Sequence, residues 1–176
     1  MKNILLLFVI LLLVSCSEQK LESNTFELLP STQQFSINSK VSTLDASALQ
    51  WSYSTQGNTL PIRYGILKNL VQIDTAEIAQ IHFNINPKVG HQAESYLLKI
   101  EEEKIRIEAQ DEAGLFYAFI TLSQIIDDAQ GQTLPILEIN DAPKIAFRPI
   151  QIDIKHHLEK KTYYYELMDH LAQLKI

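Results

Sequence analysis

Polar side chains that could hold a substrate gather around one apolar segment near the C-terminus. Residues 145–154 are dense in apolar side chains, which predicts a strand. The candidate binding residues lie within this segment or directly after it, and they are Arg148, Asp153, Lys155, His156 and His157. Cations, imidazoles and a carboxylate supply the hydrogen-bond donors and acceptors that hold a polar ligand. Binding of a polar substrate is the chemistry that these residue types predict.

A strand, a polar loop and a helix must position these side chains. Residues 163–174 carry apolar side chains at helical spacing, so the stretch as a whole predicts the first βα unit of a parallel α/β fold. Parallel barrels build their sites from loops at the C-terminal ends of strands, which favours a binding role for Lys155, His156 and His157. A solvated polar loop is the alternative interpretation of this cluster.

The other two candidates are expected to support the cluster. Arg148 lies at the start of the strand, away from the loop, so we expect a structural ion pair there. Asp153 lies inside the strand, where a carboxylate must find partners to be tolerated. We therefore expect Asp153 to be a buried group that orients its neighbours.

The length of 176 residues has room for one domain and part of another. A single βα unit cannot close a sheet or bury its own strand. We therefore expect residues 144–176 to be the truncated start of a second domain. The alternative is a short protein whose last helix packs on the first domain.

Composition excludes two further classes of protein. The chain has 15 Lys and Arg against 21 Asp and Glu, a net charge of −6, and its basic residues do not run in blocks. A nucleic-acid partner is excluded because binding to a phosphate backbone needs clustered positive charge. Disordered proteins are the second excluded class. With 46% hydrophobic and 20% charged residues, the chain can bury enough apolar surface to fold.

The N-terminus has the pattern of an export signal. Lys2 precedes an apolar run over residues 4–14, which is shorter than the roughly 20 residues that cross a membrane. The step 13–16 resembles the lipobox of bacterial lipoproteins. We expect residues 1–15 to be a lipoprotein signal peptide, Cys16 to be lipidated, and residues 16–24 to be a tether. The protein would then be exported and lipid-anchored to a bacterial membrane, on its periplasmic or cell-surface side. An ordinary secretory signal is the alternative.

Residues 25–143 predict a small α+β domain. The expected elements are extended pieces over 26–30 and 34–37, a weak helix over 44–53, strands over 79–85, 96–100, 104–109 and 134–139, and a helix from the N-cap Asp111 to Asp128. Three glutamates join the two middle strands, too short a connection for anything but an antiparallel hairpin. These elements predict a small antiparallel sheet with a helix packed on it.

Three features of this domain resemble sites, and we interpret each as structural. Trp51 could stack on a sugar, but a core aromatic is the better interpretation. His82 has no second ligand at metal spacing. Glu101, Glu102 and Glu103 are interpreted as a solvated hairpin tip rather than an acidic metal site. We predict no metal site and no cofactor.

Four blocks of the domain stand in a specific order and spacing. They are residues 93–100, 105–109, 113–124, and the pieces 134–135 and 139–143. Together they resemble the non-catalytic N-terminal domain of glycoside hydrolase family 20, the β-N-acetylhexosaminidases. The resemblance implies that residues 144–176 are the first βα unit of that family's catalytic (β/α)₈ TIM barrel.

The first barrel strand of the family is matched in part. Arg148, Asp153 and His157 agree with its pattern, whereas Pro149 replaces a glycine and His156 stands where the family places its sugar-gripping arginine. Imidazole cannot reproduce the fork of donors that arginine offers to vicinal hydroxyls. The step 153–155 instead resembles the divergent hexosaminidase D-like branch, which implies a role for Lys155 in substrate recognition.

The resemblance also implies an activity. Family members hydrolyse terminal N-acetylhexosamine residues from glycans by substrate-assisted retaining catalysis, with an Asp-Glu pair on a later barrel strand. We therefore predict no catalytic residue in this sequence, and Asp111-Glu112 is interpreted as a helix cap. The fragment should be inactive. The expected partners are an N-acetylhexosamine-containing glycan and, through Cys16, a membrane.

Two alternative functions remain open. One is a non-catalytic surface lipoprotein whose α+β module binds a glycan or another protein. The other, suggested by His156, is a longer but inactive relative of the family.

Overall fold

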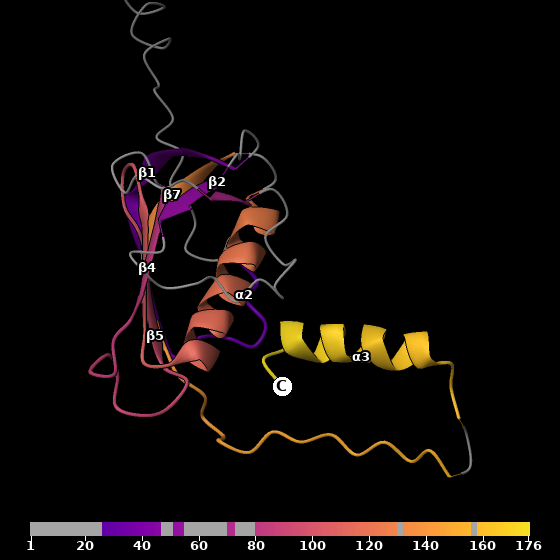
Figure 1. Cartoon of the computed structure of the whole chain (residues 1–176). Helices are drawn as coiled ribbons and strands as arrows, with labels where there is room; N and C mark the ends of the chain where they lie inside the picture. Colours follow the sequence, from indigo (N-terminus) through magenta and orange to yellow (C-terminus); the bar gives the residue numbers. More distant parts are fainter. Residues whose placement is uncertain (1–25, 47–50, 55–69, 73–79, 130–131, 156–157) are drawn as a thin grey trace, which may run out of the picture.

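The computed structural model describes residues 26–46, 51–54, 70–72, 80–129, 132–155 and 158–176, with only the backbone for 51–54 and 70–72. Within these ranges the strands are β1 (Gln34–Asp45), β2 (Trp51–Ser54), β3 (Leu70–Gln72), β4 (Ile81–Ile85), β5 (Tyr96–Ile100), β6 (Ile105–Ala109) and β7 (Thr133–Asp141). The helices are α2 (Glu112–Asp128) and α3 (Lys161–Gln173). The strands form one sheet in the order β1-β7-β5-β6-β4-β2-β3, and α2 packs against it (Figure 1). The predicted α+β class is confirmed.

The central hairpin forms as predicted. Strands β5 and β6 are antiparallel, with Tyr96 opposite Ala109 and Ile100 opposite Ile105. The backbone N–H of Glu101 donates to the carbonyl of Lys104 over 2.8 Å and closes the turn. Alternate residues of both strands are buried, because successive side chains point to opposite faces of a sheet.

The prediction of a purely antiparallel sheet is wrong. Strand β4 pairs in parallel with β6, from Ile81 opposite Ile105 to Ile85 opposite Ala109. Strand β2 also pairs in parallel with β3 and β4. Strand β6 lies between β4 and β5 in the sheet, so β4 has a neighbour that runs in its own direction. The hydrophobic pattern of a strand fixes its buried face but not its neighbours.

The weak helix predicted over 44–53 is also wrong. Leu44 belongs to β1, and Trp51 belongs to β2, while residues 47–50 between them lie outside the described ranges. Strand β1 pairs with β7, with register shifts on both sides of Val41. Pairing with a neighbour overrides a marginal helical period. Strand β1 also extends the short piece that the sequence predicts over 34–37.

Helix α2 begins at its predicted cap. The Oδ1 atom of Asp111 accepts from the backbone N–H of Gly114 over 2.8 Å, and Oδ2 accepts from the N–H of Glu94 over 2.9 Å. One carboxylate thus caps α2 and ties it to the start of β5. The ring of Phe119 meets that of Phe83 edge-on, with centroids 5.6 Å apart. Full burial of such a side chain stabilises the fold by about 1.5–3 kcal/mol.

The hydrophobic core lies between α2 and one face of the sheet. Its largest fully buried side chains are Tyr96, Phe83, Phe119, Ile81, Leu98, Ile100, Ile105, Ile107, Leu115, Ile120 and Leu122. None of the residues of α3 is buried. The described core of the small domain therefore contains no residue of the C-terminal helix.

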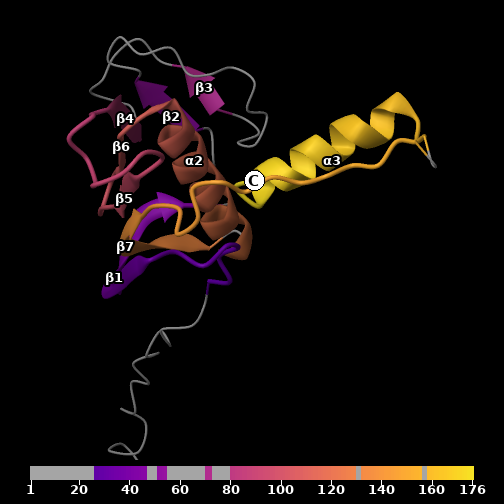
Figure 2. The ribbon, with the colours of Figure 1, turned by 90° about the horizontal axis from the view of Figure 1, so that it is seen from below.

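The C-terminal unit forms only its predicted helix. After β7 the chain runs outward as an extended segment with no strand assigned over residues 144–155, and α3 brings it back, so that the C-terminus lies near α2 (Figures 1 and 2). The strand predicted over 145–154 is therefore absent here. A strand needs a partner for its backbone groups, and this segment has none in the described chain. No helix among the described residues is long and apolar enough to cross a membrane.

Candidate functional site

The predicted binding residues are not brought together. Asp153 and Lys155 are exposed on the extended segment, where Asp153 Oδ1 accepts from the backbone N–H of Lys155 over 2.8 Å. His156 and His157 lie outside the described residues, as does Cys16. The expectation that Asp153 is buried is wrong for this structure, because no strand among the residues that it describes flanks the segment. The substrate contacts assigned to these residues stay predictions.

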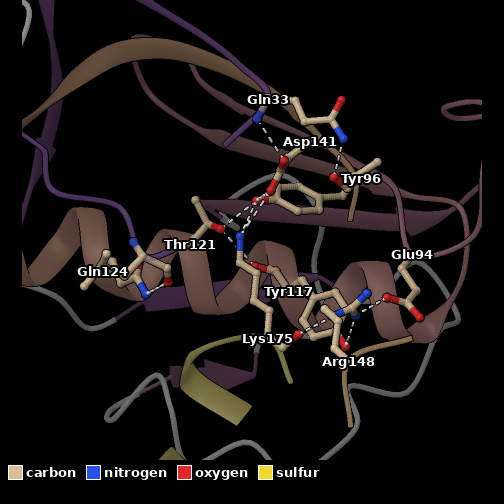
Figure 3. Close-up of polar contacts among 11 residues, drawn as sticks. Gln33, Glu94, Tyr96, Tyr117, Thr121, Gln124, Asp141, Arg148 and Lys175 are labelled. Carbon is tan, nitrogen blue, oxygen red and sulfur yellow. Dashed lines mark hydrogen bonds and ion pairs between the residues drawn. The ribbon is translucent and has the colours of Figure 1, made fainter. Parts of the chain in front are cut away.

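Arg148 sits instead against the small domain and makes the predicted ion pair. Its Nη2 atom pairs with Glu94 and donates to the hydroxyl of Tyr117 over 3.0 Å, while the guanidinium lies 5.5 Å from the centre of the Tyr117 ring (Figure 3). Partial burial lowers the pKa of Arg148, but the partners Glu94 and Tyr117 outweigh it and raise the pKa above its ordinary value. Arg148 therefore keeps its positive charge at the place where the segment after β7 contacts the small domain.

A second cluster lies beside Arg148, and the sequence did not predict it. The Nζ atom of Lys175 donates to the Tyr96 hydroxyl over 3.0 Å and to Asp141 Oδ2 over 3.2 Å (Figure 3). The Tyr96 hydroxyl also donates to Asp141 Oδ2 over 2.9 Å and lies 2.6 Å from the Thr121 hydroxyl. The side chains of Lys175 and Asp141 are only 8% and 9% exposed. This is a buried ion pair inside a hydrogen-bonded network.

The electrostatics of the cluster follow from its burial. Burial lowers the pKa of Lys175, and the carboxylate of Asp141 acts in the opposite direction. The Asp141 carboxylate is held on its other side as well, because Oδ1 accepts from the backbone N–H of Gln33 over 3.0 Å. A buried charge is tolerated when it is paired and hydrogen-bonded, as it is here.

Both clusters line one cavity at the joint between the small domain and the C-terminal segment. The cavity measures about 230 Å³, and its polar lining consists chiefly of Glu94, Tyr96, Tyr117, Asp141, Arg148 and Lys175. In the described chain, every buried polar side-chain atom has a hydrogen-bond partner. No group of three potential metal ligands occurs among the described residues. The contacts of this site hold the segment after β7 against the small domain.

The residues that the sequence analysis missed gave weak signals. Asp141 and Tyr96 occupy inward-facing positions of strands, where a polar group needs a partner, but the pattern does not say which. Thr121 faces inward from the middle of α2. Lys175 follows the last helical turn, and nothing in its neighbourhood marks it as buried. Only the fold brings these four residues together.

Tyr96 should keep its proton in the native chain at a pH where an ordinary tyrosine has lost it. Burial and then the negative charge of Asp141 raise the pKa of this phenol far above its ordinary value of 10.0, although the Thr121 hydrogen bond opposes them. The unfolded chain releases the proton near that value. The contribution of Tyr96 to stability is therefore present below pH 10 and is lost as the pH rises through the folded pKa.

A difference titration measures this shift. The phenolate absorbance of the chain is compared with that of the Tyr96→Phe variant, first in native buffer and then in concentrated urea. The difference should titrate near pH 10 in urea and be absent at the same pH in native buffer. A difference that appears near pH 10 in both conditions would show that the phenol is exposed.

The fold is that of a module carried by solved hexosaminidases. The β-N-acetylhexosaminidase from Bacteroides fragilis aligns with a TM-score of 0.69 at 22% identity, covering 85% of this chain and 31% of that chain. The family 20 exo-β-N-acetylglucosaminidase from Vibrio harveyi, in complex with N-acetylglucosamine, aligns with a TM-score of 0.66 at 25% identity, covering 86% and 24%. Both contain this α+β arrangement.

Sequence comparison identifies the family. The family model described as glycosyl hydrolase family 20, domain 2, matches residues 25–142, about two thirds of the chain. The chain therefore belongs to glycoside hydrolase family 20, and the predicted resemblance is confirmed. The N,N'-diacetylchitobiase of Vibrio harveyi is 30% identical over 82 residues. That match covers 47% of this chain but only 9% of the relative, so the chain spans a small part of the relatives it matches.

Proposed function

We propose that this chain is the N-terminal part of a β-N-acetylhexosaminidase that hydrolyses terminal N-acetylhexosamine residues from glycans. Domain 2 of family 20 occupies residues 25–142, and the relatives known as hexosaminidases and chitobiases are much longer than this chain. A non-catalytic module that precedes a catalytic domain accounts for both facts. The activity then belongs to the longer protein, and the 176-residue chain is inert.

The observation that carries this proposal is the exposure of the apolar segment over residues 145–154. Ile145 is 66%, Phe147 79% and Ile154 58% exposed, although the segment has the composition of a buried strand. Exposed apolar runs of this density mark a surface that another element covers. The structural alignments cover 85–86% of the chain, more than the domain 2 match alone, so they include residues outside 25–142. This supports a role for residues 144–176 as the first βα unit of a (β/α)₈ barrel.

The candidate binding residues fit such a barrel by position. Lys155, His156 and His157 follow the segment at the end where barrel enzymes build their sites. Asp153, exposed here, would gain its partners when neighbouring strands cover it. Arg148 lies at the other end and is held by Glu94, so we assign it to attachment ahead of sugar contact. A hexosaminidase D-like mode of recognition through Lys155 follows from the 153–155 step.

The chemistry is that of substrate assistance. The acetamide oxygen of the bound sugar attacks the anomeric carbon, a glutamate gives its proton to the leaving oxygen, and an adjacent aspartate orients the acetamide. Water then opens the cyclic intermediate, and no bond to the enzyme forms. The residues of this chain contribute binding and orientation, whereas the Asp-Glu pair comes from a later strand of the longer protein.

The same proposal includes export and anchoring. Residues 1–15 act as the signal peptide, Cys16 carries the lipid, and residues 16–24 hold the enzyme at the membrane. Two or more acyl chains anchor a protein stably, which leaves the folded part free to act on glycans on the periplasmic or cell-surface side of the membrane.

A hydrolysis assay tests the proposed activity. The longer gene product should release chromophore from a chromogenic N-acetylglucosaminide, and the 176-residue chain should release none above background. In the longer protein, Lys155→Ala should lower kcat/KM by about tenfold or more, as expected for a lost charged contact to substrate. Absence of release by the longer product would contradict hydrolysis and favour the non-catalytic lipoprotein or the inactive relative.

A further inference from the structure

We propose that Lys175 latches the C-terminal helix onto the small domain through Asp141 and Tyr96, and that α3 depends on this contact to stay folded. The helix α3 has no buried residue, yet the residue two positions after its end is buried in the small domain. The side chain of Lys175 therefore connects a helix without buried residues to the small domain.

The backbone at the end of α3 aims this side chain inward. Lys175 has a φ of +59°, a left-handed conformation that non-glycine residues adopt rarely. Its N–H donates to the carbonyl of Ala172 over 3.0 Å, and the N–H of Ile176 donates to that of Leu171 over 3.0 Å. These bonds close the helix in the manner of a left-handed C-terminal cap, although the residue is not glycine. The left-handed backbone of Lys175 is unfavourable, but it directs the side chain to its hydrogen bonds with Tyr96 and Asp141.

Arg148 forms the second point of the latch. Its Nε atom donates to the backbone carbonyl of Lys175 over 2.8 Å, while its Nη2 atom pairs with Glu94 (Figure 3). The chain leaves the small domain at Arg148 and returns to it at Lys175. Both ends of this excursion are thus fixed to each other and to the domain, and between them residues 149–155 and α3 stand away from the core (Figures 1 and 2).

We expect the buried ion pair between Lys175 and Asp141 to contribute most to the attachment of α3. Removing one partner of a buried, hydrogen-bonded ion pair leaves an uncompensated charge, which is costly. An isolated helix as short as α3 is marginal in water, so α3 depends on its attachment. Loss of Lys175 should therefore release and melt α3 while the small domain stays folded. In the longer protein, the latch would set the angle of the first barrel unit against domain 2, a step that rests on the proposed function.

Amide hydrogen exchange of the 176-residue chain tests the latch without any assay of activity. Lys175→Met keeps the length of the side chain and removes its charge, and exchange of the α3 amides should become about tenfold faster or more. Lys160→Met is the matched control, since Lys160 is exposed and makes no capping hydrogen bond with its side chain. In this control the α3 amides should exchange at the wild-type rate, and the α2 amides should be unchanged in both variants.

Equal exchange of α3 in the wild type and Lys175→Met would overturn the latch, as would equal acceleration by Lys160→Met. Should Lys175→Met also accelerate exchange in α2, a double-mutant cycle with Asp141→Asn decides. A double variant no worse than the more damaging single variant supports a direct pair, whereas strictly additive effects contradict it. Hydrolysis by the longer protein can fail or succeed independently of these results.

Discussion

Gly114→Ala should destabilise the small domain by about 2 kcal/mol, because the added methyl group has no room. A Cβ atom at this position would lie 2.6 Å from the backbone oxygen of Ser95 and 3.0 Å from the carbonyl carbon of Glu94. Both neighbours are backbone, so they cannot rotate away as a side chain would. Alanine is the better helix former by about 1 kcal/mol, and the expected loss is what remains after that gain.

The backbone at this contact is held from several sides. The Ser95 carbonyl accepts from the N–H of Gln110 over 2.9 Å, and the N–H of Glu94 is bound to Asp111. Glu94 itself has a φ of +66°, so it has little freedom to adjust. Helix α2 must therefore shift as a unit to admit the methyl group, which loosens its packing on β5.

Urea denaturation followed by circular dichroism measures this effect. Gly114→Val should be less stable than Gly114→Ala, because a branched side chain enlarges the same clash. Ser123→Ala, on the same helix and only half-buried, should leave the free energy of unfolding within about 0.5 kcal/mol of the wild type. A Gly114→Ala variant as stable as the wild type would show that α2 does not approach β5 this closely.

Local patterns predicted the parts of the fold whose stability is itself local. The alternation in β5 and β6 and the short turn between them define a hairpin without reference to the rest of the chain. The cap at Asp111 and the apolar face of α2 define the helix in the same way. These elements form as predicted because their burial and their backbone hydrogen bonds point to the same structure.

The pairing between distant segments could not be predicted from the sequence. Strand β1 was predicted only in part, because its register against β7 shifts twice and its outer residues are exposed at the sheet edge. The insertion of β6 between β4 and β5 leaves no trace in either strand's pattern. Such features depend on which strands pair. The pattern of a single sequence indicates the buried face of a strand more clearly than it indicates the neighbouring strands.

The residues of the candidate site could likewise be predicted only in part, because their partners come from distant segments. Arg148 was predicted to make an ion pair, and it does so, but its partner Glu94 could not be chosen from the sequence. Lys175 was not predicted at all, since its burial depends on a left-handed turn after α3 and on Asp141 at the end of a distant strand. The expected burial of Asp153 is not seen, because no strand of the described residues flanks the segment that carries it.

Residues 145–154 should gain far more protection from exchange than any other described segment in the longer protein that we propose. Within the described part of the 176-residue chain this segment has no strand partner, and its apolar side chains are largely exposed. As the first strand of a barrel it would be flanked on both sides, so its amides would open only with the barrel. The expected slowing of exchange is about a hundredfold or more.

Amide exchange of these residues in the longer protein, measured beside the 176-residue chain, tests the barrel assignment most directly. The amides of β5 provide the internal control, because that strand pairs with β6 on one side and β7 on the other within the small domain. We expect fast exchange over 145–154 in the short chain and slow exchange in the long one, with β5 equally protected in each. Fast exchange over 145–154 in both chains would contradict the assignment of this segment to a catalytic barrel.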